Sequence, residues 1–473
     1  MSHRTDPAHY RFGAPPVKPA VPWYKKHSPE LLAAVFFIGF AFPFIGRNDM
    51  TSEWHECYTT AARHMRAHEP IYKYGVESYV YPPAMAFLAT PLSWLSPVGS
   101  LAVWYGINVW ATCFLFIASG AMVGAPRLSK ATPFWHAVFW LTLLLSFRFV
   151  IAPLEHQQFD VVIAALVVAG CYQLWRGHEL PAGALLGAAT AMKCTPLLFA
   201  PYLVWRGKLK GAACLVTVAL ALNLLPDLVF PQSSGQSHLT QWVHTFLTDA
   251  ARKAPGTWHS DMVLNQSISG FFNRLVRHCY GWPINHPGFV IPGIAAVVVR
   301  ILTYSTALVL MAVTAWRFGR PFRPLATVPE AAARPLDWDK LRTPVETASL
   351  FCLMLLLSPM SSKAHYVILV LPVMMIARRM LEHPTRAMWA LFATLMVCGP
   401  LTTKGLLGGS LGELMLAFGV PTWFVVITLA AMWRTLAVCD SAAARLPDQH
   451  TAPRSTSAVT PPNKRQGRAG NDE

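Results

Sequence analysis

Charged residues are scarce in this chain, and acidic ones most of all. Asp, Glu, Lys and Arg together make up 13% of its 473 residues, against roughly 25% in soluble globular proteins. The chain has 23 acidic and 39 basic residues, which gives a formal net charge of +16. This composition excludes an ordinary water-soluble domain.

Several motifs that mark common enzyme classes are also missing. The nine cysteines contain no C-x-x-C pair and no cluster with the spacing of metal ligands, which argues against a zinc site or a disulfide framework. The sequence has no Gly-rich phosphate loop, no H-E-x-x-H and no G-x-S-x-G. ATP hydrolysis and zinc proteolysis are therefore not expected, and no cofactor or metal is predicted.

Long apolar runs are abundant, and they recur from Leu31 to Val438. The chain is 54% hydrophobic, with a mean hydropathy of +0.37. Runs near the length of a membrane crossing predict an all-α, polytopic membrane protein with about ten spans. The expected spans are 30–46, 98–124, 133–151, 158–174, 209–230, 288–316, 345–359, 364–379, 386–401 and 413–437.

Residues 181–205 are apolar but interrupted by Lys193, Cys194, Thr195 and Pro196. Basic residues flank this stretch on both sides, so both of its ends favour the cytoplasm. A broken helical hairpin with Lys193 near its tip satisfies that preference. A single straight span is the alternative, and it would invert the orientation of everything that follows.

The distribution of basic residues predicts that both termini are cytoplasmic. The expected organisation is a cytoplasmic segment at 1–29, a transmembrane domain at 30–437 and a disordered cytoplasmic tail at 438–473. The first span is read as a retained anchor in the plasma (inner) membrane, because no small-residue cleavage site follows it. The positive charge then faces anionic membrane lipid, and nucleic acid is not an expected partner.

Three segments are expected to meet on the outer face: 47–97, the loop 231–287 and the turn 358–366. The first contains three acids, Asp49, Glu53 and Glu56. On a helix that begins near Asp49 they are four and three residues apart and share one face. A carboxylate there could serve as the base for a transfer to a hydroxyl group. The alternative is a solvated polar face capped by Asp49. Residues 81–95 predict a further helix at the outer membrane surface.

Three charged residues lie within or at the ends of apolar stretches. Asp160 opens the span at 158–174, Lys193 interrupts the hairpin, and Arg300 lies in the middle of IAAVVVRILTYSTALV. Ionisable groups in such places are costly and often functional. The two cations suit a lipid phosphate. Helix capping by Asp160 and snorkelling of the two cations are the alternatives.

Two further polar groups lie in the expected outer segments. One is Asn265-Gln266-Ser267, and the other is the turn from Ser358 to Tyr366, which contains Lys363 and His365. Their amide, hydroxyl and imidazole groups suit sugar hydroxyls or phosphate. A purely structural turn is the alternative for each.

The order of these motifs resembles a known family. It runs from the acidic loop through Tyr81-Pro82-Pro83, the Gln-rich helix start, G-x-x-x-G-x-x-x-A-x-K ending at Lys193, N-Q-S, and S-P-x-x-x-x-x-H-Y. The chain is similar over residues 30–435 to glycosyltransferase family 87, which includes polyprenyl-phosphate-mannose-dependent mannosyltransferases. The resemblance implies the GT-C architecture.

The resemblance also assigns roles to individual residues. It places Glu53 in the slot of the family's catalytic aspartate, with Asp49 one turn earlier as the other candidate, and His55 and Glu56 beside them. The family's Gly-Gln-x-Asn is present as Gln157-Gln158-Phe159-Asp160, with an acid where an amide is usual. Lys193 and His365-Tyr366 match the family pattern. The implied donor-phosphate ligands are Lys193, Arg300, Lys363 and His365, and the implied substrate ligands are His55, Glu56, Tyr81, Gln158, Asp160, Asn265 and Gln266.

The implied activity is an inverting hexosyl transfer at the outer face of the membrane. The donor would be a polyprenyl-phosphate sugar, with mannose the best-known sugar of the family, and the acceptor a glycan or glycolipid. A transporter or flippase for a lipid-linked sugar is the main alternative, because such proteins share broken helices and intramembrane charges. It would not need acids concentrated in one outer loop.

Overall fold

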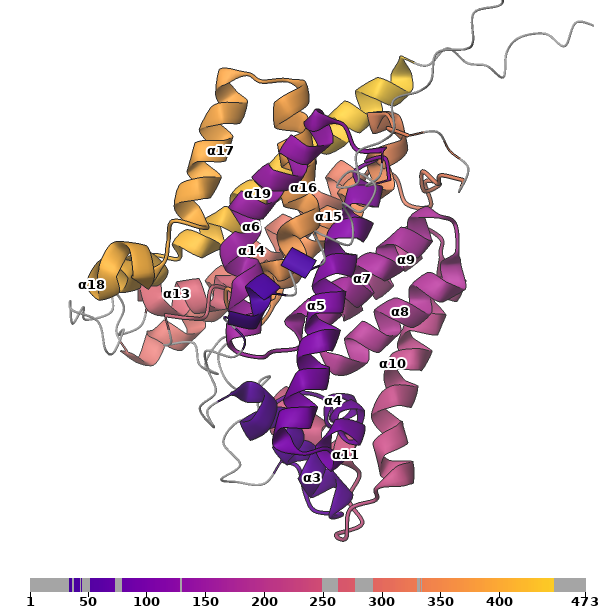
Figure 1. The fold of residues 1–473 in the computed structure, drawn as a ribbon, viewed down its shortest axis with the longest axis vertical. Coiled ribbons are helices and arrows are strands. Elements are labelled where there is room, and N and C mark those ends of the chain that lie inside the picture. The colour runs from indigo at the N-terminus through magenta and orange to yellow at the C-terminus, as the bar shows by residue number, and fades with distance from the viewer. Residues whose placement is uncertain are drawn as a thin grey trace, which may run out of the picture.

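The computed structural model shows a bundle of long and short helices (Figure 1). The residues that it describes are 52–72, 79–127, 130–248, 263–276, 292–329, 332 and 334–445, with parts of 34–44. No strand occurs within these residues. About half of the residues of the expected first span, 30–46, lie outside them.

Five described helices are long and apolar enough to cross a membrane. They are α5 (Pro97–Met122), α6 (Pro133–Glu155), α10 (Leu209–Val229), α14 (Pro292–Phe318) and α19 (Val420–Ala444). Shorter apolar helices include α7 (Asp160–Trp175), α17 (Arg386–Cys398) and α18 (Lys404–Ala417). The prediction of an all-α polytopic membrane protein is confirmed.

Two of the expected spans lie in the protein interior and are shorter than a membrane crossing. Expected span 345–359 corresponds to α15 (Arg342–Leu357), in which all residues up to Leu356 are buried. Span 364–379 corresponds to a 3₁₀ turn, η7 (His365–Leu369), followed by α16 (Val370–Glu382). Their apolar side chains pack on other helices, and hydropathy alone cannot distinguish that environment from lipid.

The broken hairpin is confirmed. It consists of α8 (Glu179–Met192), a 3₁₀ turn η4 (Thr195–Leu198) and α9 (Phe199–Trp205), with Lys193 at the break. Glu179 Oε1 accepts a hydrogen bond from Gly211 N (2.9 Å) at the start of α10, and Asn223 Nδ2 reaches Ala191 O (3.3 Å) further along. These contacts show that α8 and α10 run parallel, so the chain must return through α9 between them.

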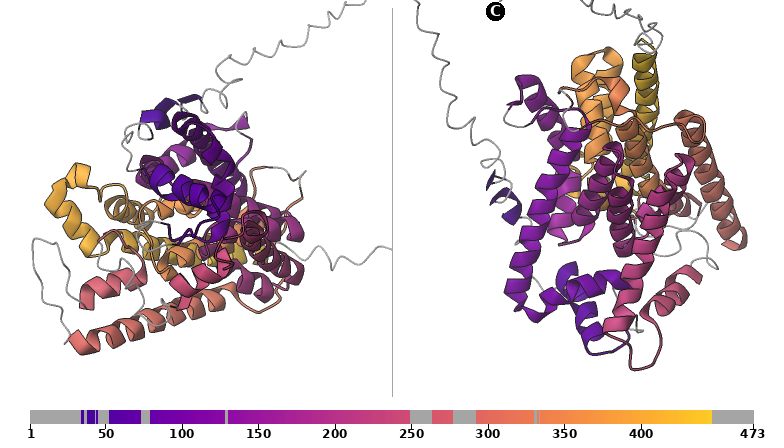
Figure 2. Two further views of the ribbon diagram at one scale, coloured as in Figure 1. Left: turned by 90° about the horizontal axis from the view of Figure 1, so that it is seen from below. Right: turned by 90° about the vertical axis from the view of Figure 1, so that its right-hand side faces the viewer.

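Parts of the segments expected on the outer face lie together at one end of the bundle, the lower end in Figure 1 and in the right-hand view of Figure 2. His68 Nδ1 contacts Pro231 O (2.7 Å), and Trp242 Nε1 donates to Val80 O (3.0 Å). These contacts join residues 52–72 and 79–94 to the chain after α10. The helices here are η1 (Trp54–Thr59), α3 (Thr60–Arg66), α4 (Pro83–Ala89), η2 (Pro91–Trp94), α11 (His238–Trp242) and η5 (Val243–Thr248).

The expected last span, 413–437, is divided between two helices. Gly419 has φ +65°, which a glycine adopts without strain, and it separates α18 from α19. Helix α19 continues to Ala444, past the expected domain end at 437, and residues 446–473 lie outside the described part of the chain. The remaining elements are α13 (Ile268–Val276) and η6 (Trp338–Leu341).

Candidate active site

The candidate site is organised by the junction between α6 and α7. After α6 ends at Glu155, Gln157 adopts a left-handed conformation with φ 56°, a common way to terminate a helix. Gln157 is fixed on both sides, because its Nε2 donates to Phe44 O (3.0 Å) and its carbonyl accepts from Trp104 Nε1 (2.9 Å). The junction therefore sets the directions of Gln158 and Asp160 at the start of α7.

Gln158 connects this junction to the segment 52–72, which carries Glu53. Its Nε2 donates a hydrogen bond to Glu53 Oε1, and Tyr58 Oη donates to Glu53 Oε2 (3.0 Å). Glu53 is the N-cap of η1, a π-helical turn in which residues five apart face the same way. Both carboxylate oxygens are therefore held by neutral donors.

The expectation that the acids share one face is wrong for the two that the structure describes. Glu53 is partly buried against Gln158 and Tyr58, whereas Glu56 is exposed. The π-helical turn breaks the 3.6-residue period on which that expectation rested. Asp49 lies outside the described residues.

The environment of Glu53 raises its pKa above the ordinary value. Burial is the largest cause, and the charge of Asp160 adds to it. The hydrogen bonds from Gln158 and Tyr58 and the charge of Lys193 act in the opposite direction but do not cancel the effect of burial. A carboxylate with a raised pKa is a stronger base than a solvated one, which suits proton abstraction from a hydroxyl group.

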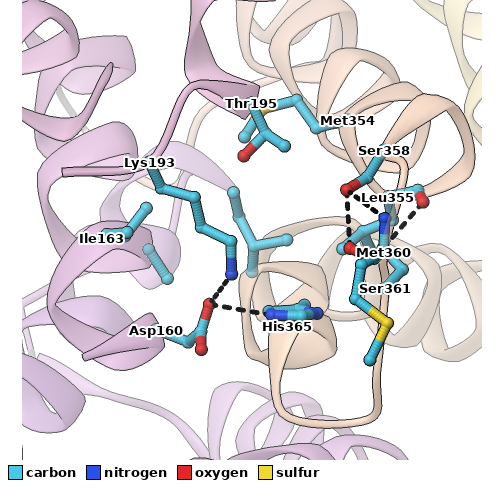
Figure 3. A pocket seen from close by; sticks show the side chains of 12 residues that line it. Asp160, Ile163, Lys193, Thr195, Met354, Leu355, Ser358, Met360, Ser361 and His365 are labelled. Carbon is cyan, nitrogen blue, oxygen red and sulfur yellow. Dashed lines mark hydrogen bonds and ion pairs between the residues drawn. The ribbon is translucent and has the colours of Figure 1, made fainter. Parts of the chain in front are cut away.

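Lys193 and His365 converge on Asp160 from two other elements (Figure 3). Lys193 Nζ lies 2.7 Å from Asp160 Oδ1, and His365 Nε2 lies 3.7 Å from the same oxygen. Lys193 comes from the hairpin break and His365 from the start of η7. Asp160 is 5% exposed, so the pair lies where its charges are only weakly screened.

The hydrogen bond at Nδ1 of His365 fixes the tautomer of this ring. The backbone N–H of Ser362 donates to His365 Nδ1 (2.7 Å), so Nδ1 is the acceptor. The proton of the neutral ring must then be on Nε2, which faces Asp160. His365 can thus donate a hydrogen bond into the site without carrying a charge.

These groups line a small pocket with a cavity volume of about 30 Å³. Its polar lining also includes Thr195, Ser358 and Ser361, and its apolar lining comes largely from α7 and α15. Asp160 Oδ2 is buried and has no hydrogen-bond partner among the described residues. The pocket thus combines a cation, an imidazole N–H and hydroxyl groups, a set that can bind phosphate or sugar oxygens.

Tyr81 and His55 are two further predicted site residues that lie near Glu53. The Tyr81 ring packs against Tyr58 (ring centroids 5.5 Å apart) and against Phe159 (4.7 Å). His55 is half-buried, and partial burial together with Arg63 lowers its pKa. Tyr81, Tyr58 and Phe159 therefore form a cluster of aromatic rings beside Glu53.

Arg300 and Lys363 are not among the residues that line this pocket. Arg300 lies on α14. Lys363 follows the Ser358–Ser361 turn, and its ammonium group donates to the carbonyl of Thr402. A contact of either residue with the donor phosphate stays a prediction.

Asn265 and Gln266 are fully buried and hold the main chain near the pocket. Asn265 Nδ2 donates to Pro359 O (3.0 Å) and its Oδ1 accepts from Ser361 N (3.2 Å). Gln266 Nε2 donates to Leu416 O (2.9 Å). The two Asn265 bonds position the turn that carries Ser358 and Ser361, and the Gln266 bond joins this region to α18. Direct contact of either residue with substrate stays a prediction.

The sequence reasoning did not identify Tyr58 or Phe159. Tyr58 holds Glu53, and the Phe159 ring packs edge-on against Tyr58 (5.0 Å) and lies 5.9 Å from Lys193 Nζ. The only signal for Tyr58 is its spacing of five from Glu53, which is meaningful in a π-helix but not in an α-helix. Within the described residues, no group of three or more His, Cys, Asp or Glu side chains is arranged to hold a metal ion.

Comparison with known proteins gives two matches. Glycosyltransferase family 87 matches residues 79–333, more than half of the chain. This range includes Gln158, Asp160 and Lys193 but neither Glu53 nor His365. A polyprenol-phosphate-mannose-dependent alpha-(1-2)-phosphatidylinositol mannoside mannosyltransferase of Mycolicibacterium smegmatis is 25% identical over 211 residues, 42% of this chain and 44% of that protein.

The chain thus covers less than half the length of that relative. No solved structure matches the chain. The family match over more than half of the sequence, together with a membrane-spanning helical fold, identifies this protein as a member of glycosyltransferase family 87.

Proposed function

We propose that this glycosyltransferase moves a hexose from a polyprenyl-phosphate donor to a hydroxyl group of a glycan or glycolipid, with inversion at the sugar carbon. One observation carries the proposal. Two residues at the start of α7, Gln158 and Asp160, join a carboxylate with a raised pKa on one side to a cation and an imidazole on the other. The reaction needs a base at one end and a ligand for a leaving phosphate at the other.

Glu53 is the proposed base. It accepts the proton of the acceptor hydroxyl as the hydroxyl oxygen forms a bond to the anomeric carbon of the donor sugar. The bond between that carbon and the phosphate oxygen breaks, and polyprenyl phosphate leaves with the bonding electrons. Attack from the face opposite the phosphate inverts the anomeric configuration. Asp49 remains the alternative base.

Lys193 and His365 are the proposed ligands of the leaving phosphate. The ammonium group of Lys193 has three donor hydrogens. One is donated to Asp160, and the other two can bind phosphate oxygens. The Nε2–H of His365, near the same oxygen of Asp160, adds a neutral donor. Asp160 then acts as a positioning residue that directs both groups. Because the donor sugar is already activated by its phosphate, the proposed reaction uses neither a nucleotide nor a metal.

The proposed location is the plasma membrane, with the site at the outer face and both termini in the cytoplasm. The hairpin supports this orientation, because Arg176 before it and Arg206, Lys208 and Lys210 after it lie together at the end opposite Lys193. Basic residues favour the cytoplasmic side. The mannosyltransferase found in the comparison depends on polyprenol-phosphate-mannose, which supports a lipid-linked donor for this protein. Mannose is one candidate sugar.

The deciding experiment measures transfer of radiolabelled sugar from polyprenyl-phosphate donors in membranes that contain the protein. The wild type is compared with Glu53→Gln and Asp49→Asn, and Glu69→Gln is the matched control because Glu69 is an exposed acid of the same segment. We expect Glu53→Gln to lower the rate by about 10²–10⁴-fold, the usual contribution of a general base, with Glu69→Gln near wild type. Loss in Asp49→Asn alone would reassign the base.

A different result would favour the alternative function. If folded wild-type protein gave no product with any of several donor sugars but moved the lipid-linked sugar across a bilayer, the transporter reading would replace the transferase.

A further inference from the structure

A second hollow lies where α14, α15 and α19 come together. Its cavity volume is about 280 Å³. Its charged lining consists of Arg317, Arg323, Arg342 and Asp440, and two tryptophans, Trp316 and Trp433, complete it. None of these residues belongs to the candidate active site.

The two pockets lie at opposite ends of the same helices. Arg342 begins α15 and lines the second pocket, whereas Ser358 follows the end of α15 and lines the first. The 16 residues of α15 correspond to about 24 Å along the helix axis. Helix α19 shows the same relation, because Thr422 near its start binds Gln266 O (2.8 Å) beside the active-site turn and Asp440 lies near its end. The second pocket is therefore near the membrane surface opposite the catalytic one.

The charges around the second pocket do not balance. Asp440 binds Arg342 and lies 3.1 Å from Arg323, while Glu346 lies 2.5 Å from Arg206 and 3.0 Å from Arg342. Three guanidinium groups thus share two carboxylates.

Arg317 adds a fourth guanidinium, and its described contact is with the Trp316 ring (4.7 Å). The excess of guanidinium groups suits an anion, and phosphate is the anion whose geometry they match best.

An apolar track leads along α14 to this pocket. Ile301, Tyr304, Leu308 and Trp316 are all exposed, by 62%, 62%, 64% and 70%. Their spacings of three, four and eight residues place them on one face of the helix. Trp433 closes the pocket on the α19 side, where its Nε1 donates to Thr314 Oγ1 (3.2 Å). Tryptophans are typical of the interface between the headgroup and acyl regions of a membrane.

We propose that this pocket binds the phosphate headgroup of an anionic phospholipid, whose acyl chains lie along the exposed face of α14. Arg317 and Arg323 contact the phosphate, and Arg342, held by Asp440 and Glu346, forms the floor. The apolar track favours a lipid over a free phosphate ion, which would gain nothing from it. This site is independent of the transfer reaction and of which sugar is moved.

The test is native mass spectrometry of the full-length protein purified in detergent. Phosphatidylglycerol and phosphatidylcholine with identical acyl chains are titrated in turn, and the dissociation constant of the first retained lipid is measured. We expect the wild type to retain phosphatidylglycerol at least tenfold more tightly. We expect Arg317→Gln/Arg323→Gln to abolish this preference, since both side chains are exposed and the surface pair of Arg323 with Asp440 contributes little to folding.

Lys210→Gln/Arg386→Gln is the matched control. It removes two exposed positive charges from the starts of α10 and α17, so it should keep the preference if the pocket rather than net charge is responsible. Ala437→Phe is a second test without any charge change. Ala437 is exposed and lines the pocket, so a larger side chain there should exclude the headgroup.

Three outcomes would overturn the proposal. The first is equal retention of the two lipids by the wild type, and the second is an equal loss in the arginine variant and its control. The third is displacement of phosphatidylglycerol by millimolar inorganic phosphate, which would indicate a site for a free anion. Loss of the preference in Ala437→Phe and in the arginine variant, with the control unchanged, would support it. Neither set of results depends on transferase activity.

Discussion

The carboxylate of Asp160 lies 2.7 Å from the ammonium group of Lys193, although 33 residues separate them in the sequence. Asp160 opens α7 and Lys193 stands at the break of the hairpin, so the ion pair joins the helix start to the hairpin tip. His365 approaches the same carboxylate oxygen from η7. A change in any one of these three elements should therefore alter how the site binds the proposed donor phosphate.

Replacing Lys193 by Gln should weaken donor binding. Loss of a charged hydrogen-bond donor to phosphate costs about 1.5–3 kcal/mol, which corresponds to a rise of about tenfold or more in the KM for the polyprenyl-phosphate sugar. Steady-state kinetics with varied donor concentration measures the effect. Lys210→Gln is the matched control, because Lys210 is exposed at the other end of the hairpin.

The Lys193 variant also leaves Asp160 as an unpaired buried carboxylate, which destabilises the fold. The double variant Lys193→Gln/Asp160→Asn removes that unpaired buried charge. If Lys193 binds phosphate, the double variant should regain stability but not donor affinity. Recovery of both would show that Lys193 serves only to neutralise Asp160.

Replacing Tyr58 by Phe should shift the pH dependence of transfer. Burial holds the pKa of Tyr58 well above its ordinary value, so its hydroxyl stays protonated and donates to Glu53. That bond stabilises the charged form of Glu53 and lowers its pKa. Its loss raises the pKa of Glu53.

The base must be unprotonated, so activity falls as pH drops through the pKa of Glu53, and this acid limb should move to higher pH in Tyr58→Phe. We expect a shift of about one pH unit, since one unit corresponds to 1.36 kcal/mol and the bond is charge-assisted. The log of kcat/KM against pH gives the value. Tyr72→Phe is the control, because the Tyr72 hydroxyl donates to Tyr81 O instead (2.8 Å). An unshifted limb would argue that Glu53 is not the titrating base.

Removing the Glu346 carboxylate should destabilise the packing of α9, the second helix of the hairpin. Glu346 and Arg206 are both 1% exposed and lie 2.5 Å apart, and they join α15 to the residue that follows α9. Glu346→Ala leaves buried guanidinium groups without their partner, at a cost of about 3–5 kcal/mol. Thermal unfolding in detergent should show a clearly lower midpoint.

Glu69→Ala provides the comparison for Glu346, because Glu69 pairs with His64 at the surface. Exposed pairs contribute at most about 1 kcal/mol, so its midpoint should change little. Equal effects of the two substitutions would contradict the buried network as a stabilising element.

Gly187→Ala should disturb the packing of α8 on α10. A Cβ at position 187 would lie 2.6 Å from Leu215 O, closer than unstrained contact allows, so the helices must separate. Overpacking of this kind costs about 1–3 kcal/mol, and the displaced hairpin tip should also lower donor affinity. Gly106→Ala on α5 is the control, since nothing lies within 4 Å of its added Cβ. Stability and KM both near wild type in Gly187→Ala would refute the close-packing argument.

The class of the protein followed from composition and pattern. Long apolar runs and a low content of charge predict helices in a membrane, because only helices and closed barrels satisfy every backbone hydrogen bond there. The hairpin was also predictable, since Lys193, Cys194, Thr195 and Pro196 interrupt an apolar run that basic residues flank on both sides. These are local properties, which short stretches of sequence express by themselves.

The sequence was a poorer guide to which apolar helices cross the membrane and which are buried inside the protein. Residues 345–359 have the hydropathy of a span, yet α15 is buried among other helices. A side chain that is packed on protein and one that faces lipid have the same apolar character, so hydropathy cannot separate them.

Composition and pattern alone predicted a helical membrane protein with acids between its first two apolar runs, a lysine at a hairpin break and a histidine in a short turn. Which of these groups meet depends on the tertiary structure. It brought Glu53 to Gln158, and Lys193 and His365 to Asp160, and it turned Glu56 to the solvent. The physical reason is that periodicity reports the face of one helix, whereas a site depends on how separate elements pack and on irregular turns such as η1 and Gln157.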